Sequence, residues 1–534
     1  MEKDLASSEE GMRRTLSTAA QNDGYWEQFS ILSTDLEHLS NVFLETEEPA
    51  TLEALTRELI AARIAQLKAL QQASSAQGRQ YRPAESYEVG ETLLFPLWGD
   101  KRGEVIAVRE GNNPEYPAFK VIRVRMDDGS EHEFAAELPG EHPLNDFTLV
   151  REEELSEEEV FARYGRQIAE KLKAALTQDE NFVSVGGRWF VRDLLLDISP
   201  MALNIIEAML DMKEGGPLRT EELLAEVELP DEVPEALRNF SLEYALMRDR
   251  RFDEVGPAGY ALWYLRRMEP KEVLEMPPHL RYVPLPYNRN LLDETMLSLE
   301  QIVDDAWAEA PFEGPAEEPI AVTLYYPHLR SGTLPLTPKL ARFFPTAQET
   351  DHIRFTFIDK LSGERFAGWV VRSGRYVYGL KEWYAQQHVG VGSLIYLSHG
   401  EEAGEIVIHV NPFRSKRGEW LRVITVEGNE FSFDTTRHPT YCEFDELAAI
   451  GTPDPEAIDA LAEHLRSIPI ESLVDRVFRE LAALTLQRAV HAVTLYSAVN
   501  LFRRIPPAPL LAILASGKPY QPLGDHYWAY RGEN

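Results

Sequence analysis

The chain has little of what disulfides, metal clusters and membrane spans require. Its 534 residues include one cysteine, Cys442, so no disulfide can form within the chain and no cysteine-rich metal cluster is expected. No run of about 18 apolar residues occurs, so no membrane-spanning helix is expected. The first ten residues are polar and acidic, unlike a secretory signal. These absences predict a cytoplasmic protein without membrane contact.

The motifs of common enzymes are also missing. The sequence contains no P-loop, no HExxH zinc motif, no GxSxG elbow and no kinase set. His132 and His142 lie beside carboxylates but lack the spacing of metal ligands. Cys442 has His438 nearby but nothing to orient a base, and His491 is interpreted as a helix cap or packing residue. We therefore predict no catalytic residue, no metal ion and no cofactor.

Positive charge is scarce and unevenly distributed. The chain has 54 Lys and Arg against 88 Asp and Glu, a net charge of −34, which argues against phosphate binding by the chain as a whole. Between Ala321 and Arg422, however, 13 basic residues outnumber 9 acidic ones. This basic segment is where a polyanion would bind, and the acidic remainder favours basic partners.

The sequence does contain a pattern that recurs three times, at 175–189, 245–263 and 513–528. Each copy reads as the end of an apolar helix, a polar turn, an aromatic residue and a short strand. A glycine-centred hairpin and a second aromatic strand follow. This is the pattern of the helix-to-wing half of a winged helix. Such modules usually hold nucleic acid or transcription proteins.

The second copy has the fullest context. The apolar spacing predicts a helix over Met201–Met212, ended by the Gly-Gly-Pro at 215–217. Thr220 is the expected N-cap of a second helix, and Leu237–Met247 forms a third before the hairpin. Three helices followed by a hairpin is winged-helix order.

The matching residues are Pro217–Leu223, Leu242–Leu246 and Arg251–Gly256. Through them, residues 199–266 resemble the winged helix of the bacterial RNA polymerase delta subunit and related restriction and chromatin proteins, the HARE-HTH family. The segment 471–531 is a looser copy. It departs from the family by carrying Pro506-Pro507 before its third helix, which argues against a groove-reading role there. The resemblance implies RNA polymerase or another protein as a partner.

The β-rich segment from 320 begins with an expected strand over Ala321–Tyr326. Its phrases LPLTPKLARFF, RFTFIDKLSGERFAGWVV, RYVYGLKEWY and VGVGSLIYL resemble the plant B-three transcription-factor pseudobarrel. That fold is shared with the N-terminal effector module of some restriction enzymes. One departure is Ser393, where the family usually has an acidic residue. The resemblance covers residues 321–412 and implies binding of double-stranded DNA.

The DNA-gripping loops of that family carry basic and polar side chains. By position, the resemblance implies that Arg330, Arg372, Arg375 and Lys381 contact DNA. Four further basic residues lie just beyond and add charge: Arg414, Lys416, Arg417 and Arg422. Arginine and lysine in such loops pair with phosphates, and arginine can read guanine.

The remaining segments complete the predicted organisation. A helical region spans 1–84, and a small barrel spans 85–150, resembling Tudor and KOW barrels in its VGE…GEV opening. A helix with a wing-like hairpin follows at 151–192, and a winged helix at 193–270. Segments 271–320 and 413–465 are expected connectors, the first acidic and proline-rich, and a winged helix occupies 466–534.

Together these patterns predict a multidomain α+β protein of winged-helix units and two small β-barrel modules. Its expected role is a non-enzymatic regulator that binds DNA through 321–422, or RNA polymerase through its winged helices. The alternative is an acidic protein-interaction scaffold without direct DNA binding.

Overall fold

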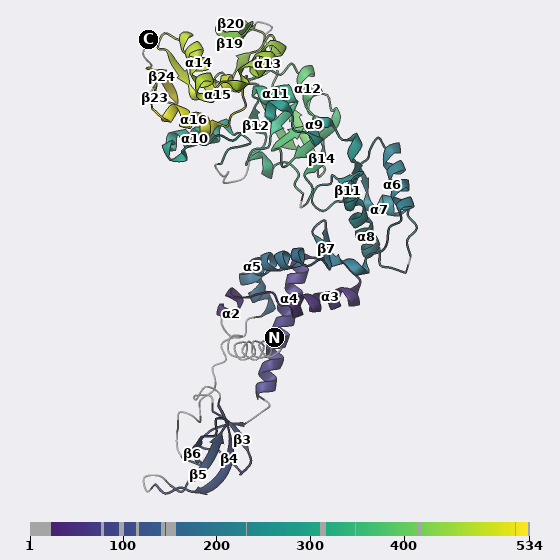
Figure 1. The fold of residues 1–534 in the computed structure, drawn as a ribbon, viewed down its shortest axis with the longest axis vertical. Coiled ribbons are helices and arrows are strands. Elements are labelled where there is room, and N and C mark those ends of the chain that lie inside the picture. The colour runs from purple at the N-terminus through teal and green to yellow at the C-terminus, as the bar shows by residue number, and fades with distance from the viewer. Residues whose placement is uncertain are drawn as a thin grey trace. The chain divides into compact units, whose positions relative to one another are not determined.

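The structure is a computed structural model of mixed α and β composition, with six sheets, which confirms the α+β class at this level (Figure 1). The chain divides into two compact units, which are described separately below. Within the residues that the structure describes, no helix combines the length and apolarity needed to cross a bilayer. The described residues are 23–75, 79–95, 101–113, 117–139, 142, 145, 156–230, 232–309, 317–347, 349–413, 418–517 and 519–531.

The first unit contains four described α-helices, a small three-stranded sheet and a five-stranded sheet. The helices are α2 (Asp23–Glu27), α3 (Ser33–Thr46), α4 (Leu52–Ser75) and α5 (Glu157–Gln178). The strands of the small sheet are β1 (Ala50–Thr51), β7 (Phe182–Val185) and β8 (Arg188–Val191), in the order β1-β8-β7. Ala50 pairs with Trp189, so the sheet joins the N-terminal helical segment to the hairpin after α5.

A five-stranded sheet falls between α4 and α5 in the chain. Its strands are β2 (Arg79–Gln80), β3 (Thr92–Phe95), β4 (Lys101–Glu110), β5 (Lys120–Met126) and β6 (Glu131–Ala136). They run in sequence order, and every pair except β2–β3 is antiparallel. The turn at Asp127-Asp128-Gly129 joins β5 to β6, and Gly129 takes the positive φ that this turn requires.

The second unit begins with three helices and a hairpin. The elements are α6 (Pro200–Met212), β9 (Leu218–Arg219), α7 (Thr220–Leu224), α8 (Glu235–Arg248), β10 (Phe252–Glu254) and β11 (Leu262–Leu265). The helices predicted at 201–212 and 237–247 are confirmed. They pack around a buried cluster that includes Ile206, Phe240 and Trp263.

The predicted N-cap of α7 is wrong by one residue. Arg219 occupies the cap position, and the Glu222 carboxylate accepts the Arg219 amide hydrogen bond at 2.9 Å. Thr220 is buried instead. Its Oγ1 donates to the Glu243 carboxylate and accepts from the Trp263 indole, both at 3.1 Å. The threonine therefore connects α7 to α8 and β11 and does not cap the helix.

The C-terminal elements follow a similar plan. They are α14 (Ile470–Ala483), β22 (Ala489–His491), α15 (Ala492–Val499), α16 (Pro507–Ala515), β23 (Tyr520–Gly524) and β24 (Tyr527–Tyr530). His491 caps α15, because its Nδ1 accepts the Val493 amide at 3.2 Å. The interpretation of His491 as a cap is confirmed.

These three groups of elements share one topology. Each runs helix, short strand, helix, helix, hairpin. In each sheet the last strand lies in the middle, between the short first strand and the first hairpin strand, giving the orders β1-β8-β7, β9-β11-β10 and β22-β24-β23. The sequence revealed only the hairpin half of the first copy, whose first two helices precede the five-stranded sheet.

A seven-stranded sheet lies between the second and third copies in the chain. Its order is β12 (Ile320–Thr323), β17 (Leu394–His399), β18 (Glu405–His409), β14 (His352–Asp359), β15 (Arg365–Val371), β16 (Tyr376–Tyr378) and β13 (Thr333–Pro335). Only β14 and β18 are parallel. All seven strands contribute to one buried cluster, so the sheet curls around its core as a half-barrel.

The strand expected over Ala321–Tyr326 is shorter than predicted. It ends at Thr323, and α11 (Tyr326–Ser331) begins three residues later with Pro327 in its first turn. Proline suits this position because its missing amide hydrogen would have no partner there. The helix α12 (Lys381–Gln386) also packs on the core through Trp383 and Tyr384.

The two expected connectors carry regular structure. The first contains α9 (Lys271–Leu274) and α10 (Glu294–Val303). The second contains β19 (Glu419–Glu427) paired along its whole length with β20 (Glu430–His438), then β21 (Ile450–Gly451) and α13 (Pro455–His464). Residues of α10, β19, β20 and α13 join the third copy in one large buried cluster.

Candidate functional site

Of the predicted DNA-contacting residues, Arg330 is committed to an internal ion pair. It lies on α11, and its Nη2 is 2.5 Å from Oδ2 of Asp459 on α13. Burial opposes ionisation of Asp459, but hydrogen bonds from His279, Arg330 and Tyr326 lower the pKa of this carboxyl to about 2. Asp459 therefore stays ionised at neutral pH and holds the Arg330 guanidinium.

Arg372 and Arg375 occupy the turn between β15 and β16, and both are exposed. Arg372 donates to the Thr350 carbonyl at 2.9 Å. Arg375 donates to the Ala306 carbonyl at 3.2 Å and stacks over the Trp307 ring at 4.6 Å. Both arginines therefore hold nearby backbone carbonyls, although each residue is exposed as a whole.

Lys381 is exposed and begins α12, at the opposite end of β16 from this turn. The amide of the preceding Leu380 donates to the Gly332 carbonyl at 2.9 Å, which places Lys381 near the end of α11. Arg422 lies on β19, in a different sheet, and donates to the Glu446 and Ala449 carbonyls. Arg414, Lys416 and Arg417 lie outside the described residues. The described candidates thus occupy three separate places.

The helix before each hairpin carries no net positive charge. α5 has four acidic and four basic residues and starts with three glutamates. α8 has two of each sign. α16 has no charged residue, and nearly all its side chains are buried. Phosphate contacts need clustered Lys and Arg, and none of these three helices has an excess of basic residues.

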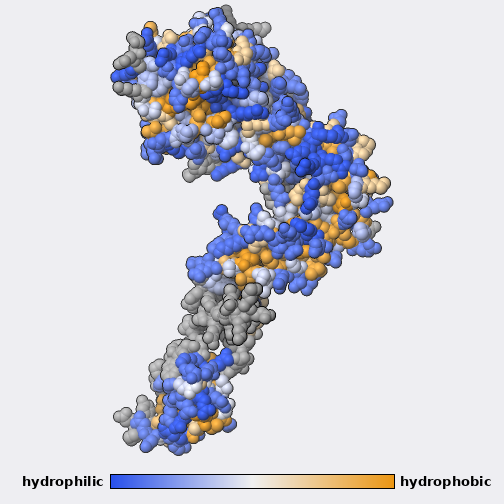
Figure 2. All heavy atoms as spheres, viewed as in Figure 1, coloured by the Kyte–Doolittle hydropathy of each residue, from blue (hydrophilic) through white to orange (hydrophobic). Residues whose placement is uncertain are grey.

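An exposed apolar stripe runs along α6. Met201, Ile205 and Met212 are 73%, 39% and 79% exposed, and Ala208 lies between them. Their spacing puts them on one helix face, opposite Ala202, Ile206 and Leu210 in the core. Figure 2 shows tan and orange atoms over this part of the surface. We call these four residues the α6 stripe.

Cys442 is buried, and its Sγ donates to Ser393 Oγ at 3.2 Å. Burial raises the pKa of the thiol, which keeps it protonated and unreactive at neutral pH. The interpretation of Cys442 as a buried thiol is confirmed.

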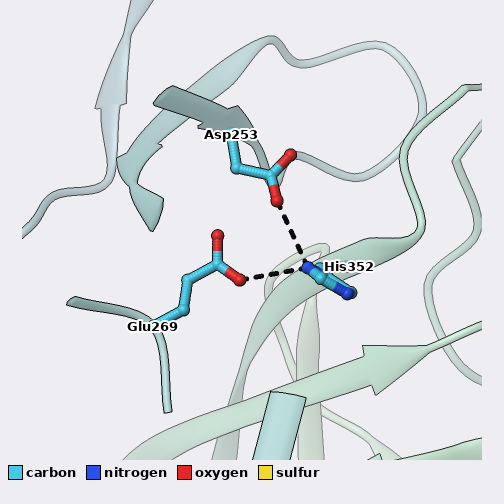
Figure 3. Close-up of side chains that lie close together, drawn as sticks. All are labelled: Asp253, Glu269 and His352. Atoms are coloured by element: carbon cyan, nitrogen blue, oxygen red, sulfur yellow. Dashed lines mark hydrogen bonds and ion pairs between the residues drawn. The ribbon is translucent and has the colours of Figure 1, made fainter. Parts of the chain in front are cut away.

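A cluster of titratable side chains that the sequence did not reveal lies where β10 meets β14. Asp253 comes from β10, Glu269 from the segment after β11, and His352 from the start of β14. Both carboxylates point at Nδ1 of His352 (Figure 3), with Oδ2 of Asp253 at 3.2 Å and Oε2 of Glu269 at 3.0 Å. The potential ligand atoms all lie within 4.8 Å of one another.

Burial controls the charge of this cluster. The Glu269 side chain is fully buried, and its Oε1 has no hydrogen-bond partner among the described residues. Burial raises the pKa of this carboxyl, and the hydrogen bond from His352 only partly offsets that effect. Burial would lower the pKa of His352, but its bonds to Asp253 and Glu269 raise it to about 9. The neighbouring Asp253 carboxylate also raises the pKa of Glu269.

Sequence reasoning could not find this cluster. Sixteen residues separate Asp253 from Glu269, and eighty-three separate Glu269 from His352. No local spacing links residues so far apart, because their approach depends on the pairing of whole elements.

No family model, curated protein or solved structure matches the chain, so its function has to be argued from its own residues.

Proposed function

We propose that this protein is a non-enzymatic scaffold of three winged helices and two small barrel-like modules that binds a protein partner. The observation that carries the proposal is the neutral or buried character of α5, α8 and α16. In a winged helix that reads DNA, the helix at this position enters the major groove. A helix without an excess of basic residues is poorly suited to the phosphate contacts that dominate affinity for DNA.

The shared topology supports the winged-helix assignment. Three helices followed by a hairpin is winged-helix order, and all three copies have this order, with a short strand after the first helix. The HARE-HTH family includes a polymerase subunit, so a protein partner fits the resemblance as well. In the third copy, Pro506-Pro507 and the burial of α16 both oppose groove reading.

The α6 stripe is the surface that best suits a protein partner. Large exposed side chains aligned on one helix face are unusual on a surface that stays in water, and such patches often mark interaction sites. Methionine is common at interfaces because its flexible side chain adapts to different partners. We propose that the stripe binds the apolar face of a partner segment.

The test is recovery of partners from cell extract by the tagged full chain, with nuclease treatment before capture. Met201→Glu/Met212→Glu removes the stripe, and Leu486→Glu is the matched control, since Leu486 is fully exposed on the third copy. We expect the same partner with and without nuclease, retained by the Leu486 variant and lost by the stripe variant. Recovery that disappears with nuclease, or that survives the stripe substitution, contradicts the proposal.

Direct DNA binding remains a second proposal because Arg372, Arg375 and Lys381 are exposed on the half-barrel, the module that resembles a DNA-binding pseudobarrel. Fluorescence anisotropy with labelled duplex at several salt concentrations tests it. If these residues contact phosphates, charge reversal at all three weakens binding and lowers the salt slope by about 3. Binding that is absent, or unchanged by the reversal, rejects this surface.

A further inference from the structure

We propose that Asp253, Glu269 and His352 form a binding site for one divalent transition-metal ion. The three side chains come from β10, the segment after β11 and the start of β14, and converge on one point (Figure 3). The site is independent of the scaffold proposal, since it lies within the fold and away from the α6 stripe in the sequence.

The spacing of the ligand atoms fits a coordination sphere. The carboxylate oxygens lie 3.0 and 3.2 Å from Nδ1 of His352. Adjacent ligands on an ion with bonds of about 2.1 Å are roughly 3.0 Å apart in octahedral and 3.4 Å apart in tetrahedral geometry. The three groups therefore need little movement to bind an ion between them.

The unpartnered oxygen is the second observation. Oε1 of Glu269 is buried and accepts no hydrogen bond from the described residues. A buried carboxylate oxygen without a partner is costly, and a bound ion is one way to satisfy it.

The surroundings of Nε2, the other ring nitrogen of His352, also suit a metal-binding histidine. Oδ2 of Asp351 lies 3.5 Å from Nε2 of His352, and Ser373 donates to both oxygens of this aspartate at 2.7 and 2.6 Å. Metal-binding histidines typically direct their second ring nitrogen to a carboxylate, which fixes the tautomer and the ring orientation. Asp351, held by Ser373, is placed for this positioning role.

The ligand set indicates the class of ion. One imidazole nitrogen with two carboxylates suits Zn²⁺ or Mn²⁺, whereas Ca²⁺ and Mg²⁺ prefer oxygen ligands alone. Backbone hydrogen bonds from Ala258 to Thr346 and from Arg354 to Val255 already align the second copy with the half-barrel. An ion bound here would also link the second copy to the half-barrel, so we expect it to raise the stability of the folded chain.

The experiment uses the full chain, stripped with EDTA and dialysed. ZnCl₂ and MnCl₂ are titrated by isothermal calorimetry and by thermal unfolding, and CoCl₂ by visible absorption. We expect one ion per chain, a raised melting temperature and cobalt d–d bands. Glu269→Gln, nearly isosteric, and His352→Gln should each weaken binding more than about tenfold.

His399→Gln is the matched control, because His399 also pairs with a carboxylate, that of Glu318, but outside the cluster. It should bind as the wild type does. Failure of the wild-type chain to bind stoichiometrically, or equal binding by Glu269→Gln, overturns the proposal. The cobalt spectrum of the wild-type chain needs no variant, so absent bands overturn it even if His352→Gln does not fold.

Discussion

At the scale of single residues, a buried ion pair between Arg504 and Asp305 makes the second unit sensitive to substitution of either residue. Nη2 of Arg504 lies 2.5 Å from Oδ2 of Asp305, and both side chains are almost fully buried. The Tyr496 hydroxyl donates to the same carboxylate oxygen. The pair joins the segment after α10 to the segment after α15.

We predict that Asp305→Ala lowers the free energy of unfolding by about 3–5 kcal/mol, because it leaves the Arg504 charge buried and unpaired. Removing both charges with Asp305→Leu/Arg504→Met should cost less than the single substitution. Urea unfolding of the second unit measures both. A double variant less stable than Asp305→Ala would contradict this explanation.

Asp459 gives a pH dependence with a defined sign. Its folded pKa of about 2 lies below the unfolded value, so the stabilisation is present above about pH 4 and is lost as pH falls towards 2. The stability difference between wild type and Asp459→Asn should therefore shrink over that window. Unfolding measured from pH 5 to pH 2.5 checks this, and a difference independent of pH would exclude Asp459 as the source.

At the scale of elements, helix caps determine where helices begin. Ser156 starts α5: its Oγ accepts the Glu159 amide, and the Glu159 carboxylate accepts the Ser156 amide at 2.8 Å. The helix begins at Glu157, directly after this cap. The sequence could place this boundary because capping is local.

We predict that Ser156→Ala destabilises α5 by about 1 kcal/mol, so that amide hydrogen exchange in its first turns becomes roughly fivefold faster. Ser298→Ala is the control, since Ser298 is exposed within α10 and its hydroxyl bonds only to a carbonyl three residues back. Exchange in α10 should stay within about twofold. Unchanged exchange in α5 would show that Ser156 does not hold the helix end.

Elements with strong local patterns were predictable, and pairings between distant elements were not. Apolar spacing predicts the helices at 201–212 and 237–247, and the structure contains both. The β1–β8 pairing was missed because Ala50 and Trp189 are separated by the whole five-stranded sheet. The cluster around His352 was missed for the same reason.

At the scale of the whole molecule, the division into two units predicts separable folding. Among the residues that the structure describes, the four buried clusters of the second unit include none before Ile198. We therefore expect the fragment 196–534 to fold alone, with a cooperative thermal transition and dispersed NMR signals. A shorter fragment, 320–534, lacks the second copy. It should be less stable, because Val255, Tyr264 and Val273 belong to a buried cluster that also contains residues of β15 and β16.

A fragment 196–534 that stays unfolded, or a fragment from 320 that is equally stable, would contradict this division. Circular dichroism melts of the two fragments at equal concentration distinguish the outcomes.

The place of the five-stranded sheet has a consequence for synthesis on the ribosome. Roughly 80 residues separate the end of α4 from the start of α5. At about 5–20 residues per second, the partners of α3 and α4 emerge several seconds after those helices do. Their apolar faces stay uncovered in the nascent chain for that interval, so chaperone binding there should end when β8 leaves the exit tunnel.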